Sequence, residues 1–218
     1  MKIVISGLTA AGKTTLATRL ASQLRVSYIS GSDILRGVLG DRSAEWHPGI
    51  DEMRQDLDLE RQVDNEILAR FESMSEGVFD AWCLPWLIQS HATVVWIESD
   101  FESRVRKCFV SYVERGKKKT HSECERIVQA KDAKSRYVFL TNWGFDIFTS
   151  REPFNLILDA STLIPEPTEC AAAMGANTLF MAACLGMRRI DRGLSLPELM
   201  PATASGIQHL ITNLHGRH

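Results

Sequence analysis

The residues best suited to chemistry lie near the N-terminus, in the run Gly7-Leu8-Thr9-Ala10-Ala11-Gly12-Lys13-Thr14. This run fits the phosphate-binding pattern G-x-x-x-x-G-K-[ST] and lies between an expected strand and an expected helix, which is the context that the pattern requires. Small residues let backbone N–H groups and the positive end of the following helix point at phosphate oxygens. We expect Lys13 to reach the β- and γ-phosphates of ATP and Thr14 to hold Mg²⁺. The expected nucleotide cradle consists of Gly7, Ala10, Ala11, Gly12, Lys13, Thr14 and Thr15.

A phosphate-binding loop does not say how the γ-phosphate is used, because kinases, GTPases and ATPases share related loops. A GTPase is expected to carry a guanine-reading N-K-x-D, and the sequence contains none. The chain is also short for a motor ATPase. We therefore expect a kinase.

Acidic and basic residues follow the expected strands at the edge where ligands of open α/β sheets bind. Asp80 ends one strand, where it would hold Mg²⁺ through water or accept a hydrogen bond from the attacking group. Asp33 and Arg36 follow another strand, and Arg36 is spaced to pair with a phosphate on the acceptor. The alternative for Asp33 and Arg36 is a helix cap and a surface pair. Surface positions are expected for His47, His91 and His121.

The elements that must position these groups alternate between strands and helices. Short β-branched or apolar runs predict strands, and apolar residues at three-to-four-residue spacing predict helices. Such alternation implies a parallel sheet between helical layers. The expected strands are 2–6, 26–30, 77–80, 93–97 and 154–158, and the expected helices are 13–24, 33–39, 51–73, a segment from about 165 through 183, and a second near 201–214.

A highly charged stretch, 102–136, contains a dense set of lysines and arginines. Phosphoryl transfer spreads negative charge over the transferred group, so arginines from this stretch would neutralise that charge. We expect Arg115 and Arg136 to act with Lys13 and Asp80 in catalysis. The alternative is a solvated helical hairpin, and for most of the individual lysines that alternative is preferred.

Composition excludes several other classes. The chain has 218 residues, 44% of them hydrophobic, and a formal net charge of −2, which does not fit disorder or the basic stripe of a nucleic-acid-binding protein. Its five cysteines show no metal-binding spacing and are expected to be reduced thiols. No apolar run approaches the length of about 18 residues that spans a membrane. We expect a cytoplasmic protein that binds a small-molecule acceptor, without nucleic acid or membrane partners; the oligomeric state is left open.

Together with the phosphate-binding loop, five later segments give the chain a resemblance to the cytidylate kinase family of nucleoside monophosphate kinases. They are Ser30–Arg36, Val78–Trp82, Ser135–Tyr137, Trp143–Asp146 and Asn155–Ser161. The resemblance covers about 160 residues and implies a three-layer α/β/α P-loop kinase fold with a parallel sheet and a helical lid. It also implies ATP- and Mg²⁺-dependent phosphoryl transfer to a nucleoside monophosphate, most simply CMP, dCMP or a modified pyrimidine nucleotide.

The sequence departs from this family on the acceptor side. Trp82 stands where the family has an arginine that binds the acceptor nucleotide, and Ala133 stands where bacterial members have an aspartate. An aromatic side chain cannot form a salt bridge to phosphate, but it would stack on a base or sugar. We therefore expect a conventional donor site and an altered acceptor site that includes Asp33, Arg36 and Trp82.

Two alternatives remain open. One is a kinase that phosphorylates a hydroxyl of a small molecule, such as an antibiotic or a biosynthetic intermediate, on the same scaffold. The other is a non-catalytic ATP-binding module. The expected organisation is a kinase domain over 1–184, with acceptor-side helices at about 33–73 and a lid at about 104–137. The extension over 185–218 has no assigned role.

Overall fold

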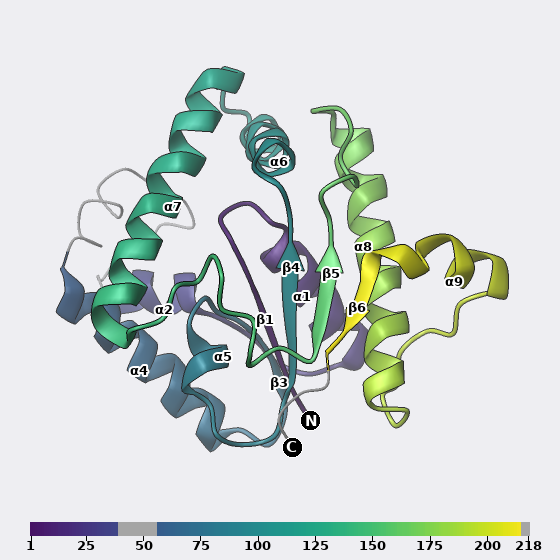
Figure 1. Cartoon of the computed structure of the whole chain (residues 1–218), viewed down its shortest axis with the longest axis horizontal. Helices are drawn as coiled ribbons and strands as arrows, with labels where there is room; N and C mark the ends of the chain where they lie inside the picture. The colour runs from purple at the N-terminus through teal and green to yellow at the C-terminus, as the bar shows by residue number, and fades with distance from the viewer. Residues whose placement is uncertain (39–55, 215–218) are drawn as a thin grey trace.

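Six strands form one sheet in the part of the chain that the computed structural model describes, residues 1–38 and 56–214. The order across the sheet is β2-β3-β1-β4-β5-β6 (Figure 1). The first five strands pair in parallel, and β6 pairs antiparallel with β5. The strands are β1 (Lys2–Gly7), β2 (Tyr28–Ser30), β3 (Gly77–Asp80), β4 (Thr93–Glu98), β5 (Leu156–Asp159) and β6 (Ile211–Asn213).

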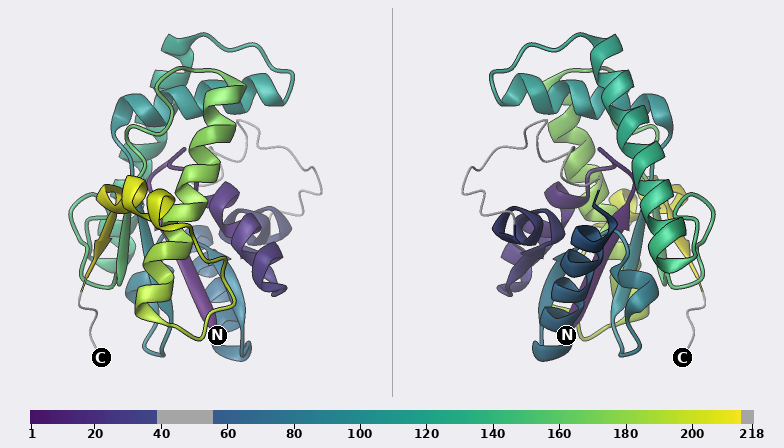
Figure 2. Two further views of the ribbon diagram at one scale, coloured as in Figure 1. Left: turned by 90° about the vertical axis from the view of Figure 1, so that its right-hand side faces the viewer. Right: turned by 90° about the vertical axis from the view of Figure 1, so that its left-hand side faces the viewer.

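Helices cover both faces of this sheet. One face carries α1 and α8, and the other carries α4, α5 and the lower part of α7, while α6 and the upper part of α7 rise beyond the sheet edge (Figures 1 and 2). The helices are α1 (Lys13–Leu24), α2 (Gly31–Val38), α4 (Leu57–Ser73), α5 (Leu84–Leu87), α6 (Phe101–Glu114), α7 (His121–Trp143), α8 (Glu169–Ile190), α9 (Pro201–Ile207) and the 3-10 turn η1 (Gln208–Leu210).

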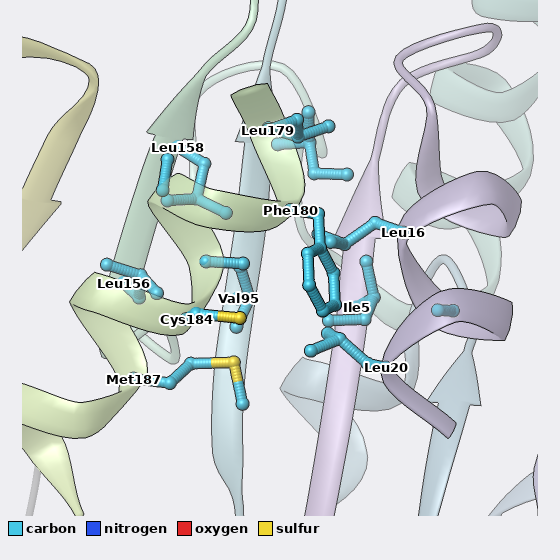
Figure 3. Close-up of a cluster of buried hydrophobic side chains, with 14 of the residues drawn as sticks. Ile5, Leu16, Leu20, Val95, Leu156, Leu158, Leu179, Phe180, Cys184 and Met187 are labelled. Carbon is cyan, nitrogen blue, oxygen red and sulfur yellow. The ribbon is translucent and has the colours of Figure 1, made fainter. Parts of the chain in front are cut away.

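The central strand β1 shows why the sheet needs two helical layers. Ile3 and Ile5 point into the cluster formed with α1 and α8, and Val4 points into the cluster on the opposite face. Successive side chains of a strand alternate between faces, so a strand that is apolar at every position is stable only when both faces are covered. Figure 3 shows the first of these clusters, in which Leu16 and Phe180 extend from α1 and α8 toward the sheet.

The expected three-layer α/β/α architecture is confirmed, with one correction at its edge. The helix expected near 201–214 ends at Ile207, and Ile211–Asn213 form the antiparallel strand β6. The sheet is therefore mixed rather than wholly parallel. The β-branched residues Ile211 and Thr212 favour an extended chain, and β6 satisfies the backbone groups of the β5 edge while Ile211 becomes buried.

The segment after residue 184 contributes Ile211–Asn213 to the same sheet. Helix α8 continues through residue 184 to Ile190, so the boundary expected between 184 and 185 falls inside a helix. By length and composition α8 would also be able to cross a membrane, but half of its apolar window is buried in the protein. Its buried residues pack on α1 and β5, as a core helix of an α/β protein does.

Most other expected elements agree closely with the structure. The helix expected over 13–24 has the bounds of α1, and the strand expected over 77–80 has the bounds of β3. The helix expected over 51–73 is present from Leu57, with Asp56 as its N-cap. The first five residues of that expected helix, and the expected surface residue His47, lie outside the described residues.

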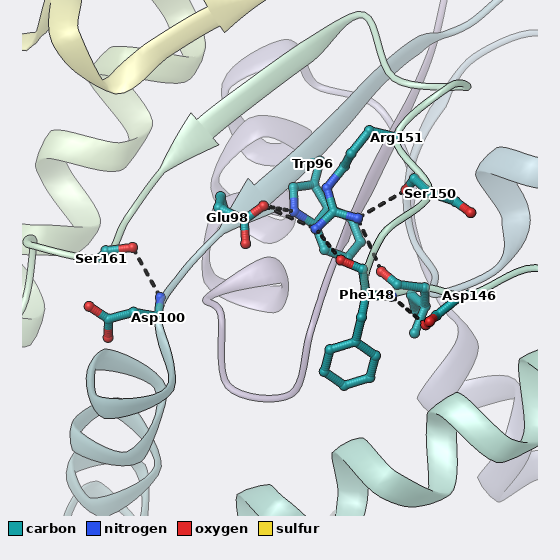
Figure 4. A network of polar contacts seen from close by, with 9 residues as sticks. Trp96, Glu98, Asp100, Asp146, Phe148, Ser150, Arg151 and Ser161 are labelled. Atoms are coloured by element: carbon teal, nitrogen blue, oxygen red, sulfur yellow. Dashed lines mark hydrogen bonds and ion pairs between the residues drawn. The ribbon is translucent and has the colours of Figure 1, made fainter.

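A polar network holds the segment that follows α7 against β4. The Arg151 guanidinium pairs with Glu98 at 3.0 Å, donates to three backbone carbonyls and lies 3.9 Å from the centre of the Trp96 ring (Figure 4). The Trp96 indole N–H also donates to Glu98, at 2.9 Å. This network fixes the segment between α7 and β5 against the end of β4.

Candidate active site

The phosphate-binding loop joins β1 to α1 at the point where the sheet's crossovers diverge, since β1 lies between β3 and β4. Its backbone needs glycine at Gly7, where an added Cβ would lie 2.8 Å from the Ile97 carbonyl oxygen. Gly12 has φ +100° and Ala10 has φ +61°, both in the left-handed region. The loop therefore curls tightly, as a cradle of backbone N–H groups for an anion must.

Lys13 is buried within this loop. Its Nζ donates to the carbonyl oxygens of Gly7 at 2.8 Å and Leu8 at 2.9 Å, and lies 4.7 Å from the centre of the Trp82 ring. The ammonium group is thus held at the mouth of the cradle by neutral backbone carbonyls. A phosphate oxygen would be a stronger partner for Lys13 because the hydrogen bond would be charge-assisted on both sides.

Thr14 and Asp80 form the arrangement expected of a magnesium site. The Thr14 hydroxyl donates to Asp80 Oδ2 at 2.7 Å, and the Tyr28 hydroxyl donates to the same oxygen at 3.1 Å. Burial, and then the Asp80 charge, raise the pKa of Tyr28 far above its usual range, so Tyr28 remains a donor. Sequence reasoning missed Tyr28, although it lies two residues before the end of β2.

The residues present fit Mg²⁺, which prefers hard oxygen ligands and is commonly held by one or two carboxylates together with substrate phosphates. Thr14 supplies a hydroxyl and Asp80 a carboxylate at the carboxyl edge of adjacent elements. Within residues 1–38 and 56–214 no cluster of three or more His, Cys, Asp or Glu side chains forms a metal cage. The donor set therefore suits a metal that arrives with a nucleotide.

A cavity of about 190 Å³ opens beside Lys13, between the loop, β3, α2, α4 and α7. On its walls, apolar side chains alternate with two carboxylates of α4, Glu60 and Asp64, which are 4% and 7% exposed. Glu60 and Asp64 occupy positions in the same i, i+3, i+4, i+7 stripe as Val63 and Ile67. A carboxylate at a core-facing helix position is the sequence signal that would have identified them. The other lining residues are Thr9, Ala10, Lys13, Thr14, Gly31, Ser32, Leu35, Asp80, Ala81, Trp82, Lys131 and Phe139.

Trp82 forms part of the cavity wall, where the sequence suggested an aromatic acceptor contact. Its carbonyl accepts a hydrogen bond from the Ser6 hydroxyl at 2.9 Å, which ties it to β1. Its ring lies 5.9 Å from that of Phe139 of α7. Two neighbouring aromatic side chains lie outside the cavity lining, since Phe79 is fully buried and Trp86 stacks on Phe145.

Two expected acceptor residues lie outside this cavity. Asp33 and Arg36 form an ion pair with each other on α2, and neither is among the lining residues. This geometry is the cap-and-surface-pair alternative. An acceptor role for Asp33 and Arg36 stays a prediction.

The expected lid is a helical hairpin of α6 and α7. Arg136 pairs with Asp146 at 2.5 Å, and Arg115 is exposed at the end of α6 that lies away from the sheet. Neither arginine lines the cavity, so their catalytic roles stay predictions. The cation that α7 brings to the cavity in this structure is Lys131.

A second, small apolar cavity lies on the other side of the loop, against α8. Gly12 and Thr15 form its loop side, and Leu163, Gly175 and Leu179 form part of the opposite wall. This small cavity and the 190 Å³ cavity lie on opposite sides of the phosphate-binding loop. The loop thus separates a narrow apolar site from a wider polar one.

The sequence also matches known proteins. Residues 6–131 match the model of a family described as AAA domain. The chain is 24% identical over 169 residues to cytidylate kinase of Sulfolobus acidocaldarius, a match that covers 76% of this chain and 88% of that protein. It is 24% identical over 184 residues to cytidylate kinase of Sulfurisphaera tokodaii, covering 84% and 98%. These matches confirm the resemblance that the sequence motifs indicated.

Among solved structures, an uncharacterized protein from Eubacterium ventriosum aligns with a TM-score of 0.55 and 12% identity, over 80% of this chain and 95% of that one. At this identity the likeness shows the fold alone.

Proposed function

Because the chain belongs to the AAA domain family and is a P-loop kinase, we propose that it transfers the γ-phosphoryl group of ATP to a pyrimidine nucleoside monophosphate. CMP, dCMP or a modified relative is the expected acceptor. The observation that carries the proposal is the cavity of about 190 Å³ in which Lys13, the Thr14–Asp80 pair and the wall of α4 and α7 meet. Support for a pyrimidine acceptor comes from the relatives named cytidylate kinase, whose matches extend over most of this chain.

Phosphoryl transfer requires little covalent chemistry from the protein, which mainly positions the reactants and neutralises charge. Lys13 would leave the carbonyl oxygens of Gly7 and Leu8 for the phosphate oxygens. Mg²⁺, when bound, neutralises charge on the β- and γ-phosphates. Thr14 and Asp80 would hold it, and Tyr28 keeps the Asp80 carboxylate in place. Movement of α6 and α7 toward the loop would exclude water.

The two cavities beside the loop suggest how donor and acceptor are oriented. The cavity of about 30 Å³ next to Gly12 and Thr15 would receive the base of ATP after opening, because aliphatic groups line it together with Ser99, Ser103 and Lys107. The larger cavity on the Lys13 side would then receive the acceptor. The γ-phosphate lies between them in this arrangement, next to Lys13.

A specific observation favours a second candidate, transfer to a hydroxyl of a small molecule. Glu60 and Asp64 place carboxylates at the larger cavity, where Asp64 accepts a hydrogen bond from the Trp143 indole N–H. Trp82 stands where the resemblance to cytidylate kinases implies a phosphate-binding arginine. Carboxylates favour an acceptor that donates hydrogen bonds over one that is itself an anion. In this case Asp80 would accept the hydroxyl proton as a general base.

The first experiment is a measurement of ADP release from Mg·ATP with CMP, dCMP, UMP, dTMP, AMP and GMP, each at low and high concentration. Strong stimulation by a pyrimidine nucleotide is expected. Lys13→Ala is the inactive control, because it removes the buried ammonium group from the cradle. If no nucleotide stimulates a protein that binds ATP, the hydroxyl acceptor becomes the leading candidate, and alcohols and aminoalcohols are the next panel.

Trp82→Arg separates the two candidates further. If the acceptor is a nucleotide, an arginine at this position is expected to lower the KM for CMP or dCMP by supplying a charge-assisted contact. Phe139→Leu is the matched control, because it changes the aromatic wall without adding charge. A Trp82→Arg enzyme that gains nothing with either nucleotide would contradict the pyrimidine acceptor.

A further inference from the structure

A buried ion pair connects the lid to the phosphate-binding loop. Arg104, in the first turn of α6, pairs through its NH1 with Asp132 Oδ2 of α7 at 2.6 Å, and the two side chains are only 5% and 9% exposed. The same guanidinium nitrogen lies 3.4 Å from the backbone carbonyl oxygen of Thr9, in the loop. One guanidinium therefore joins three elements that are far apart in the sequence.

Two polar atoms of this ion pair and two hydroxyl oxygens near it are buried without a hydrogen-bond partner. Thr9 Oγ1, Arg104 Nε, Asp132 Oδ1 and Ser135 Oγ are buried without a hydrogen-bond partner, and in the described ranges 1–38 and 56–214 only Trp86 Nε1 shares that condition. Burial raises the pKa of Asp132. The Arg104 guanidinium and the Thr9 side chain lower this pKa and so oppose the effect of burial. Buried polar groups are normally satisfied, so a cluster of spare donors and acceptors at one place points to a function other than stability alone.

Residues on either side of this ion pair line the cavity of about 190 Å³ beside Lys13. Thr9 lines that cavity from the loop, and Lys131, which precedes Asp132 in α7, lines it from the lid. The arrangement therefore controls the spacing between a lid cation and the cradle. Small changes in such spacing have large effects on transfer rates, because reacting groups must be held in near-attack geometry.

We propose that Arg104 and Asp132 are positioning residues that hold Lys131 over the transferred phosphoryl group by clamping α7 to the Thr9 carbonyl. This inference rests on the proposed phosphotransferase activity. Arg104 acts through Lys131 and through the loop, and it does not itself contact the substrate. The Thr9 hydroxyl, in the loop, can donate to the Asp132 carboxylate as α7 moves, so this carboxylate keeps a hydrogen-bond donor during closure.

The test is a double-mutant cycle on the full chain with Arg104→Gln, Lys131→Ala and the double variant. The kcat for ADP release with the preferred acceptor and the dissociation constant of a non-hydrolysable ATP analogue are both measured for each protein. Each single substitution is expected to lower kcat by roughly 10²- to 10³-fold, as removal of one preorganised donor does. The double variant should be little worse than Lys131→Ala, because interacting residues give non-additive effects. Multiplying effects, or an unchanged kcat in folded Arg104→Gln, would overturn the proposal.

Two further proteins guard against a purely structural explanation. Arg104→Lys keeps the charge but loses the guanidinium fork, so it should fold and recover part of the lost kcat. Arg151→Lys is the matched control, since it alters another partly buried arginine ion pair away from the cavity and should keep the wild-type kcat. If Arg104→Lys matches Arg151→Lys in kcat and differs only in melting temperature, the pair is merely structural.

The same cycle in ATP-analogue affinity distinguishes failure of the clamp from failure of the proposed function. A wild-type protein that binds the analogue but transfers phosphoryl to no acceptor contradicts the proposed function. In that case the proposal is tested by the dissociation constants alone. The effects of Arg104→Gln and Lys131→Ala on the affinity for the ATP analogue must again be non-additive, and additive effects would overturn the proposal.

Discussion

Asp80 offers a direct test of the transfer site, through the variant Asp80→Asn. The carboxylate is 7% exposed, and its Oδ2 accepts hydrogen bonds from Thr14 at 2.7 Å and Tyr28 at 3.1 Å. An asparagine amide oxygen can accept both of these bonds. The substitution therefore removes the negative charge while leaving the local geometry available.

The effect on stability should be small because two contributions oppose each other. A hydrogen bond to a charged group contributes about 1.5–3 kcal/mol and a neutral one about 0.5–1.5, so neutralising Asp80 weakens its two bonds by roughly 2–3 kcal/mol in total. Removing a buried charge recovers a desolvation cost of several kcal/mol. We expect a net change within about 2 kcal/mol, which for a domain of this size corresponds to a melting shift below about 8 °C.

The effect on catalysis should be much larger. Asp80 would help to hold Mg²⁺ and, with a hydroxyl acceptor, would take its proton, and general-base contributions alone are typically about 10²- to 10⁴-fold. That range equals roughly 2.7–5.4 kcal/mol of transition-state stabilisation. The loss of kcat should therefore exceed any loss that unfolding explains.

The assay combines ADP release at varied Mg²⁺ with thermal melting of the same preparation. Glu98→Gln is the matched control, because Glu98 also ends a parallel strand but pairs with Arg151 outside the cavity. We expect Asp80→Asn to need more Mg²⁺ and to lose at least 10²-fold in kcat, and Glu98→Gln to keep its activity. If Asp80→Asn keeps kcat within about fivefold of wild type, the assignment of Asp80 to the transfer site is refuted.

Two other predictions concern the helices that flank the site. The Thr120 backbone N–H is the main cause of a pKa of about 2 for Glu123 in the capping box of α7. A lowered pKa stabilises the folded state above the ordinary value near 4.5 and loses that effect as pH falls toward 2. The stability difference between wild type and Glu123→Gln in urea should therefore shrink from pH 5 to pH 3, and a constant difference would contradict this. Gly175→Ala should destabilise α8 by about 1–3 kcal/mol in the same assay, since its Cβ would lie 2.5 Å from the Leu163 carbonyl oxygen. Gly206→Ala, with nothing within 4 Å of its Cβ, should not, and equal effects of the two would show that the close approach is unimportant.

Sequence patterns predicted the donor side in detail because its determinants are local. The spacing of Gly7, Gly12 and Lys13 specifies a loop conformation within eight residues, and the apolar stripe of α1 begins directly after it. Hydrophobic patterns also predicted the parallel strands, because a strand with apolar side chains on both faces is stable only where helices cover both faces of the sheet. The family resemblance then predicted the order of the remaining elements.

The acceptor side could not be predicted in the same way because its residues come from distant segments. Sequence reasoning selected Arg36 and Arg136 by position, but side-chain packing pairs them with Asp33 and Asp146, outside the cavity. Glu60 enters the cavity only because α4 packs with its apolar stripe against the sheet. The strand β6 likewise forms because the β5 edge needs a hydrogen-bonding partner, which propensity at 211–213 alone does not reveal.

By itself, then, the sequence determined the phosphate cradle and the α/β layers, because short-range steric and periodic rules fix them. The class of reaction followed from the phosphate-binding pattern together with the family resemblance. Tertiary structure decided which charged side chains line the cavity beside Lys13. Lys131, Asp64 and Trp82 meet at one cavity although they lie on α7, on α4 and just after β3. Arg104 and Asp132 meet because burial brings α6 and α7 together, and a buried charge is stable only where an opposite charge reaches it. Such pairings depend on three-dimensional distance, which residue spacing does not encode.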